Sequence, residues 1–244
     1  MGRKVITGRN LTNYEREKIS KNRRKQMIKI EEFDELQKKL YSAVIADILD
    51  DFGVRNNVMH YSIKAITQNM SVMGRAFTIL ATDVYQQPEK PYELEIEAVD
   101  NTGKGDVIVA TTNKSTSSGF WGELLSTGAK GHGCRGAIID GLTRDQKMII
   151  EMGFPLFVRG SSPYDSKGRT DVIAYQVPIV CGNVLVKPGD IIFADIDGIV
   201  AIPQDIEDEV IKKALEKVRG ENKVREELLA GVSVKEVFNK YHLL

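Results

Sequence analysis

The sequence is poor in the residues that cross-link a chain or anchor it in a membrane. It contains two cysteines in 244 residues, Cys134 and Cys181, without a CxxC spacing or a secretory leader, so we expect two reduced core thiols in a cytosolic protein. No apolar run approaches the roughly 18 residues of a membrane-spanning helix, and no membrane contact is expected. The three histidines are scattered, and H-E-x-x-H, P-loop and G-x-S-x-G motifs are missing, which argues against zinc-protease and serine-hydrolase chemistry.

The chain also has no formal net charge, because 34 basic side chains balance 34 acidic ones. The balance hides an asymmetry: residues 1–30 hold ten Lys and Arg against two acids, and the rest of the chain holds 24 against 32. We interpret residues 1–30 as a basic N-terminal arm, with oligomer assembly as one possible role. Nucleic acid is not an expected partner, since the arm has few aromatic residues and charge runs are usually solvated faces.

Hydrophobic periodicity predicts an α/β protein. Apolar residues recur every fourth position from residue 36 to residue 52, ahead of Gly53, and predict one amphipathic helix of about four to five turns. Helices are also predicted at 93–100, 121–130 and 144–152, and strands at 63–67, 72–81, 106–111, 136–140 and 155–159. Their alternation indicates layered α/β architecture. No Pro/Ser/Gly-rich linker follows residue 30, so we expect a single domain over residues 31–244.

The last third of the chain has a different pattern. Residues 171–203 are rich in β-branched residues and interrupted by short turn signals, which predicts antiparallel strands and hairpins. From Gln204 onward the pattern is again helical. Acidic residues there suit the first turn of a helix: Asp205, Glu207, Asp208 and Glu209.

A G-x-G-x-x-G match spans residues 131–136. A dinucleotide site needs a strand before the glycines and a helix after them, so that the helix N-terminus meets the phosphates. Here the predicted helix precedes the glycines and the strand follows. We therefore reject nucleotide binding and expect the glycines to end the helix and turn into the sheet.

The candidate chemistry lies in two segments. Gly122, Glu123, Leu124 and Leu125 open a predicted helix after a Ser/Gly loop, and such a helix start can hold a small carboxylate. Arg144 and Asp145 follow the strand at 136–140 and open a second predicted helix. Arg144 suits the carbonyl oxygen of an α-keto acid and its enolate, Asp145 suits Mg²⁺ or Mn²⁺, and Glu123 suits the metal's water shell. The alternative is structural: Thr143 or Asp145 caps a helix, and Arg144 and Glu123 are surface charges.

These segments also carry a family resemblance. The runs GFWGELLS at 119–126 and GAIIDGLTRD at 136–145, followed by GFPLF, SPYDSKGR, VPI, CG and PGDIIFADIDG in order, resemble the RraA-like family over about residues 35–210. That family includes class II 4-hydroxy-4-methyl-2-oxoglutarate / 4-carboxy-4-hydroxy-2-oxoadipate aldolases, which also decarboxylate oxaloacetate, and the regulator of ribonuclease E activity.

The resemblance implies a single β/β/α swivelling-type domain, here with added N- and C-terminal helices, that forms trimers or hexamers with a pyruvate site at the subunit interface. It implies that backbone amides of Gly122–Leu125 bind the pyruvate carboxylate, that Arg144 meets the enolate oxygen and that Asp145 holds the metal. A second acid from a neighbouring subunit is implied, and Asp195 and Asp197 are the candidates. Lys167 and Arg169 either contact a distal substrate carboxylate or belong to a solvated loop.

We therefore expect a cytoplasmic, divalent-metal-dependent lyase that cleaves a 4-hydroxy-2-oxo acid to pyruvate and a second carbonyl compound. The alternative is a non-catalytic regulatory protein of the ribonuclease E inhibitor type. The basic arm and the helical tail after Ala214 are additions to the shorter members of the family. They leave the identity of the hydroxy-oxo acid open.

Overall fold

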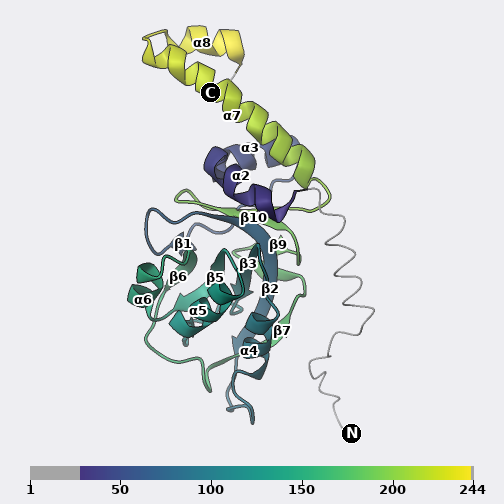
Figure 1. The fold of residues 1–244 in the computed structure, drawn as a ribbon, viewed down its shortest axis with the longest axis vertical. Coiled ribbons are helices and arrows are strands. Elements are labelled where there is room, and N and C mark those ends of the chain that lie inside the picture. The colour runs from purple at the N-terminus through teal and green to yellow at the C-terminus, as the bar shows by residue number, and fades with distance from the viewer. Residues whose placement is uncertain (1–27, 243–244) are drawn as a thin grey trace.

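The computed structural model describes residues 28–242. The predicted basic arm, residues 1–30, therefore lies outside the described residues except for its last three positions. The described chain forms a curled mixed sheet with helices on its faces and a helical extension at its C-terminal end (Figure 1). Within residues 28–242, no helix combines the length and apolar character needed to cross a bilayer.

The main sheet has nine strands in the order β1-β6-β5-β3-β2-β10-β11, with β4 along β5 and β7 along β2. The first six strands along the chain are β1 (Lys64–Ala65), β2 (Val72–Asp83), β3 (Asp106–Thr111), β4 (Gly119–Trp121), β5 (Gly136–Thr143) and β6 (Leu156–Ser161). The others are β7 (Thr170–Tyr175), β10 (Ile191–Ala194) and β11 (Ile199–Ile202), while β8 (Ile179–Cys181) and β9 (Val184–Val186) form a separate hairpin.

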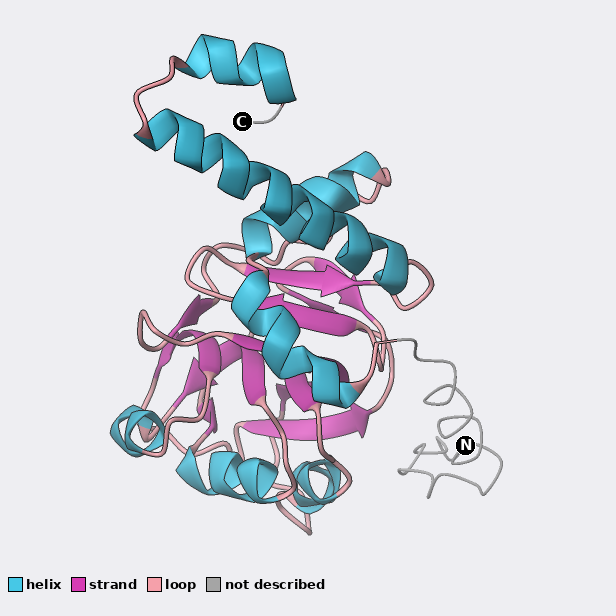
Figure 2. Cartoon of the chain, turned by 45° about the horizontal axis from the view of Figure 1, so that its top comes forward, coloured by secondary structure: helices cyan, strands magenta, loops and turns pink. Residues whose placement is uncertain are grey.

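The centre of the sheet is parallel, because β2, β3, β5 and β6 are joined by helical crossovers. The connecting helices are α4 (Glu93–Asp100), α5 (Glu123–Gly131) and α6 (Gln146–Glu151). They pack on one face of the sheet (Figure 2). Their residues Val99, Ala129 and Ile149 join a core with strand residues such as Ile108 and Ile139. Parallel strands that are covered on both faces have nearly continuous apolar sequences. In agreement with this, all six residues of β3 are buried.

The remaining elements cover the rest of the sheet. The β8–β9 hairpin packs on the other face in a second core with Ile138 and Phe157. A third core joins β10 and β11 to α2 (Phe33–Lys39), α3 (Ser42–Asp51) and α7 (Glu207–Leu229). A short 3-10 turn, η1 (Ile30–Glu32), precedes α2, and α8 (Val234–Tyr241) ends the described chain.

The prediction of one continuous helix over residues 36–52 is wrong, because the segment forms two helices separated at Leu40 and Tyr41. Both residues have extended backbone angles. The cause is a distant side chain: the Asp195 carboxylate accepts hydrogen bonds from the Ser42 backbone N–H at 2.8 Å and from its hydroxyl at 2.6 Å. These contacts give α3 its own N-terminal anchor, and the helix stops at Gly53 (φ +76°) as predicted.

The other local predictions hold with shifted ends. The predicted helix at 121–130 begins two residues later, since Trp121 belongs to β4. Residues 170–202 form strands and hairpins, all paired antiparallel. The 131–136 glycine run lies between the end of α5 and the start of β5, so it has the helix-then-strand order that rules out a dinucleotide turn. Both cysteines are free and buried.

A buried ion pair fastens the C-terminal helix to the sheet. Arg75 on β2 forms a two-pronged pair with Glu207 at the start of α7, and both side chains are 4% exposed. Arg75 also donates to the carbonyl oxygens of Gly189 and Ile28 at 3.2 and 3.0 Å. The first-turn acids of α7 thus do more than complement its dipole, because Glu207 neutralises a buried guanidinium.

We expect Glu207→Ala to destabilise the fold by about 3–5 kcal/mol, because it leaves the Arg75 charge buried without its partner. Glu209→Ala is the matched control: Glu209 lies in the same helical turn but is exposed, and its loss is expected to change stability by less than about 0.5 kcal/mol. Urea unfolding of both variants measures the difference. Equal midpoints would contradict the role of the pair.

Candidate functional site

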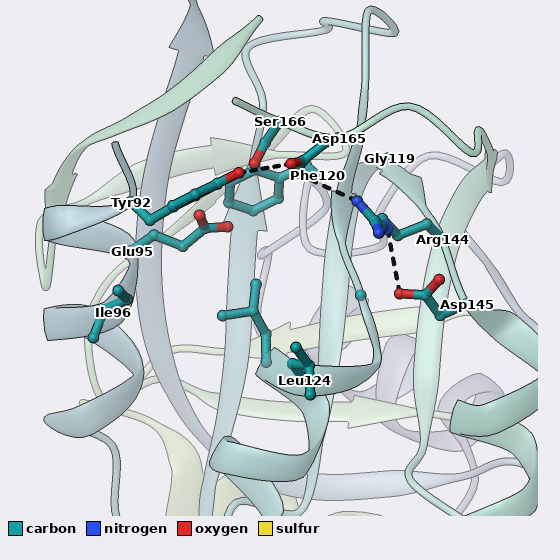
Figure 3. Close-up of a pocket in the computed structure, with 12 residues that line it drawn as sticks. Tyr92, Glu95, Ile96, Gly119, Phe120, Leu124, Arg144, Asp145, Asp165 and Ser166 are labelled. Carbon is teal, nitrogen blue, oxygen red and sulfur yellow. Dashed lines mark hydrogen bonds and ion pairs between the residues drawn. The ribbon is translucent and has the colours of Figure 1, made fainter. Parts of the chain in front are cut away.

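A pocket of about 310 Å³ opens at the carboxyl ends of the central parallel strands. Crevices at this edge of open α/β sheets are the usual position for ligands. Its walls come from α4, β4, the start of α5, the end of β5 and the loop after β6 (Figure 3). It is lined by Tyr92, Glu95, Ile96, Gly119, Phe120, Gly122, Leu124, Leu125, Arg144, Asp145, Asp165 and Ser166.

One backbone carbonyl joins the two predicted segments of the site. The Trp121 carbonyl oxygen accepts the Arg144 N–H at 2.8 Å and the Thr143 hydroxyl at 2.7 Å. Trp121 is fully buried, and its ring N–H donates to the Ser126 hydroxyl at 2.8 Å. The end of β5 is therefore held against the start of α5.

The first turn of α5 presents free amides at this point. The first intrahelical hydrogen bond runs from the Ser126 N–H to the Gly122 carbonyl oxygen at 3.1 Å, so the amides of Glu123, Leu124 and Leu125 precede it. The Glu123 N–H donates to Asp145 Oδ2 at 3.3 Å, which leaves the Leu124 and Leu125 amides for a ligand. Such amides carry the partial positive charge of the helix start and suit a carboxylate. A Cβ at Gly122 would lie 2.9 Å from Asp145 Oδ2 and 3.1 Å from Arg144 Cγ, so a side chain here would displace both of these side chains.

Arg144 and Asp145 both line the pocket, and Asp145 is also the N-cap residue of α6. Asp145 adopts a left-handed backbone conformation (φ +58°) ahead of α6, and its side chain makes no capping hydrogen bond there. Its Oδ2 lies 3.3 Å from Arg144 Nε and 3.3 Å from the Glu123 N–H. Thr143 is bonded to Trp121 instead. Asp145 thus occupies the N-cap position of α6 without a side-chain cap there, and its carboxylate instead accepts the first amide of α5.

Glu123 contributes its backbone to this arrangement more than its side chain. Its carboxylate accepts the Thr127 hydroxyl at 2.7 Å, one turn along α5, and is not part of the pocket lining. Leu124, by contrast, lines the pocket and is 80% exposed. The predicted contact of Glu123 with a metal's water shell remains a prediction.

The sequence did not single out Tyr92 and Asp165, which extend the arginine cluster. Asp165 Oδ1 lies 3.3 Å from an Arg144 terminal nitrogen, and Asp165 Oδ2 accepts the Tyr92 hydroxyl at 2.6 Å. Burial opposes ionisation of Asp165, but the Tyr92 hydrogen bond and the Arg144 charge outweigh it and lower its pKa. Burial and Asp165 raise the pKa of Tyr92 to about 12, so Tyr92 stays a donor.

Glu95, on the first turn of α4, is a further lining residue that the sequence did not single out. It is 5% exposed, and burial followed by the charges of Asp171 and Asp165 raises its pKa to about 8. Ala98 and Val99, three and four positions later, are the other buried residues of α4. The sequence signal that could have identified Glu95 was therefore an acidic residue on the apolar stripe of this helix.

Other predicted residues lie apart from the pocket of a single chain. The Asp195 carboxylate accepts hydrogen bonds from Ser42 and from the Asp197 N–H, the latter at 3.0 Å. Asp197 itself is exposed. Lys167 and Arg169 are exposed and do not line the pocket; the Arg169 guanidinium lies 4.6 Å above the Tyr164 ring. Their suggested contacts with a partner subunit or a distal carboxylate remain predictions.

The pocket lining includes a carboxylate, Asp145, of the type that binds a divalent cation together with its water shell. Among residues 28–242 there is no group of three or more His, Cys, Asp or Glu side chains arranged around one metal position. Mg²⁺ retains several waters and commonly binds proteins through one or two carboxylates. Asp145, half-exposed at the pocket wall with Oδ2 facing Glu123 and Arg144, matches that pattern.

Comparison with known proteins identifies the family. Residues 42–201 match the model of the RraA-like family, described as Aldolase/RraA. A Halalkalibacterium halodurans protein named "Putative 4-hydroxy-4-methyl-2-oxoglutarate aldolase" is 32% identical over 76% of this chain and 83% of its own length. Protein DlpA of Legionella pneumophila is 30% identical over 82% of this chain, which spans only 32% of that longer protein.

Solved structures with the same fold also match this chain. An uncharacterized protein from Pseudomonas syringae superposes with a TM-score of 0.75 at 26% identity, covering 85% of this chain and 94% of its own. Streptomyces coelicolor RraAS2, described as an unusual member of the RNase ES inhibitor RraA protein family, gives a TM-score of 0.70 at 29% identity over 78% and 96%. The RraA-like fold and motif order are thus found together, and the chain belongs to the RraA-like family.

Proposed function

We propose that this protein is a divalent-metal-dependent lyase that cleaves a 4-hydroxy-2-oxo acid to pyruvate and a second carbonyl compound. The observation that carries the proposal is the convergence of three groups in one pocket: the free amides of α5, the Arg144 guanidinium and the Asp145 carboxylate. The name of the Halalkalibacterium relative supports the same reaction class. Decarboxylation of oxaloacetate forms the same enolate and is a companion activity.

The residues act by binding and charge stabilisation. The amides of Gly122–Leu125 bind the substrate carboxylate, as helix starts bind anions. Arg144 donates to the C2 carbonyl oxygen, where negative charge develops when the C3–C4 bond breaks, and pre-positioned donors at such an oxygen lower the barrier. Asp145 holds the Mg²⁺ or Mn²⁺ ion, which when bound supplies Lewis-acid stabilisation of the same oxygen.

A regulatory role without catalysis is the second candidate. The similarity to the Streptomyces protein, a member of an RNase inhibitor family, favours it. A regulator does not need a pocket at which free helix amides, a guanidinium and a carboxylate converge. Oxaloacetate decarboxylation measured with Mg²⁺ and then with EDTA separates the two functions, because a regulator leaves only the background rate under both conditions.

Arg144→Ala is expected to lower kcat for pyruvate formation by about 10²-fold or more, because it removes a donor to the developing enolate oxygen. The matched control is Lys147→Ala, which removes a cation three residues away that is 87% exposed. Pyruvate release from a panel of 4-hydroxy-2-oxo acids measures both. Full activity in Arg144→Ala would overturn the assignment.

Asp145→Asn is expected to weaken Mn²⁺ binding more than about 10-fold, because it removes the charged ligand. Asn tolerates the left-handed conformation of this position, so the fold should persist. Electron paramagnetic resonance of free Mn²⁺ measures binding directly. Asp100→Asn, an exposed carboxylate at the end of α4, is the control, and equal affinities in the two variants would contradict the role of Asp145.

We further propose that the protein is a homo-oligomer with the pocket at a subunit interface. The pocket rim carries exposed apolar side chains, with Ile96 53% and Leu124 80% exposed, and Met148 on α6 is 53% exposed. Clustered exposed apolar residues are typical of interaction surfaces. Light scattering is expected to give about three or six times the 27.2 kDa chain mass. A monomeric mass would contradict this proposal.

A further inference from the structure

Glu95 is placed to contact whatever enters the pocket. Its carboxyl group lies on the α4 wall, across the pocket from Arg144 and Asp145 (Figure 3). The side chain is 5% exposed, and within the described chain its Oε1 atom has no hydrogen-bond partner. A buried polar atom without a partner is costly, so a ligand that supplies one gains affinity at this point.

The surroundings of Glu95 keep it uncharged at neutral pH. Tyr92 precedes it on the same wall, Asp165 and Ser166 approach from the loop after β6, and Asp171 lies on β7. Burial and the negative charges of Asp171 and Asp165 raise the pKa of Glu95 to about 8. A neutral carboxyl group both donates and accepts a hydrogen bond, which matches a hydroxyl group.

The same surroundings disfavour a second negative charge. Arg144 is the single cation among the twelve lining residues, and it already contacts Asp145 and Asp165. Lys167 and Arg169 are exposed outside the lining, and Arg169 donates to the Asp165 carbonyl oxygen at 3.2 Å. A distal carboxylate at the α4 wall would face Asp165 and Asp171 without a cation of its own.

We propose that Glu95 is a specificity-determining residue that hydrogen-bonds a hydroxyl group on the distal part of the substrate. The substrate class is then a 4-hydroxy-2-oxo acid with an uncharged, hydroxylated tail. The oxoglutarate derivative named for the Halalkalibacterium relative differs, since it carries a second carboxylate. This inference rests on the proposed pyruvate-forming function, because that function places the substrate carboxylate at α5 and its tail at α4.

The protonation state of Glu95 is testable without substrate. A carboxyl group whose pKa is higher in the folded than in the unfolded chain loses stabilisation as pH rises through that window, here from the ordinary 4.5 to about 8. Glu95→Gln keeps a donor and an acceptor but cannot ionise. We expect its melting temperature to fall less than that of the wild type between pH 5 and pH 8.5. Parallel curves would contradict the assigned neutral state.

The substrate assignment is tested with two substrates that differ only in the tail. With Mg²⁺ present, kcat/KM is measured for 4,5-dihydroxy-2-oxopentanoate and for 4-hydroxy-2-oxoglutarate, with pyruvate quantified by chromatography. We expect the wild type to prefer the hydroxyl tail by about 10-fold or more, since a site that hydrogen-bonds a hydroxyl discriminates strongly. Glu95→Gln should keep the preference. Glu95→Ala should lose it through a lower kcat/KM for the hydroxyl-tailed substrate.

Exchange of pyruvate methyl protons with D₂O is the control, because it uses the pyruvate part of the site and not the tail. We expect Glu95→Ala to lower the exchange rate by less than it lowers kcat/KM for the hydroxyl-tailed substrate. A wild-type preference for the carboxylate tail, or equal losses in Glu95→Ala for both substrates and for exchange, would overturn the role of Glu95 while the lyase function stands. A wild type that neither exchanges nor cleaves would overturn the lyase function, and the substrate assignment with it.

Discussion

The site depends on the Trp121 carbonyl oxygen, which accepts both the Arg144 N–H and the Thr143 hydroxyl. This contact joins the start of α5 to the end of β5, two segments that are separated by a full helical crossover. Together with the β4–β5 strand pairing, it brings the amides that suit a carboxylate and the guanidinium that suits a carbonyl oxygen to one pocket. Trp121 is buried and its ring N–H donates to Ser126, so this junction is packed and hydrogen-bonded, and pre-positioned groups are what charge stabilisation requires.

The parts of the fold that the sequence predicted are those determined by local rules. The buried strands β3 and β5 are continuous apolar runs, and α4 and α5 have clear turns before or after them. The break between α2 and α3 was not predictable in this way. Its apolar pattern is continuous, and the separation comes from Asp195, which lies 153 positions away in sequence and binds Ser42. Such tertiary contacts override helical periodicity without leaving a local trace.

The same distinction applies to the site. Gly122, Arg144 and Asp145 follow recognisable strand and loop boundaries, and the motif order of a known family covers them. Tyr92, Glu95 and Asp165 come from α4 and from the loop after β6, and they meet the arginine only because the sheet brings those elements to one edge. No local sequence pattern indicates that Asp145 and Asp165 both form ion pairs with Arg144.

Charge balance inside the pocket links these observations. Asp145 and Asp165 are each within 3.3 Å of Arg144, while burial and neighbouring carboxylates keep Glu95 protonated near neutral pH. The lining therefore carries one negative charge in excess, although the whole chain has none. One substrate carboxylate would double that excess, and a divalent cation at Asp145 would then restore neutrality. A substrate with a second carboxylate would leave the pocket negative again, so the balance that favours a divalent metal also favours an uncharged tail.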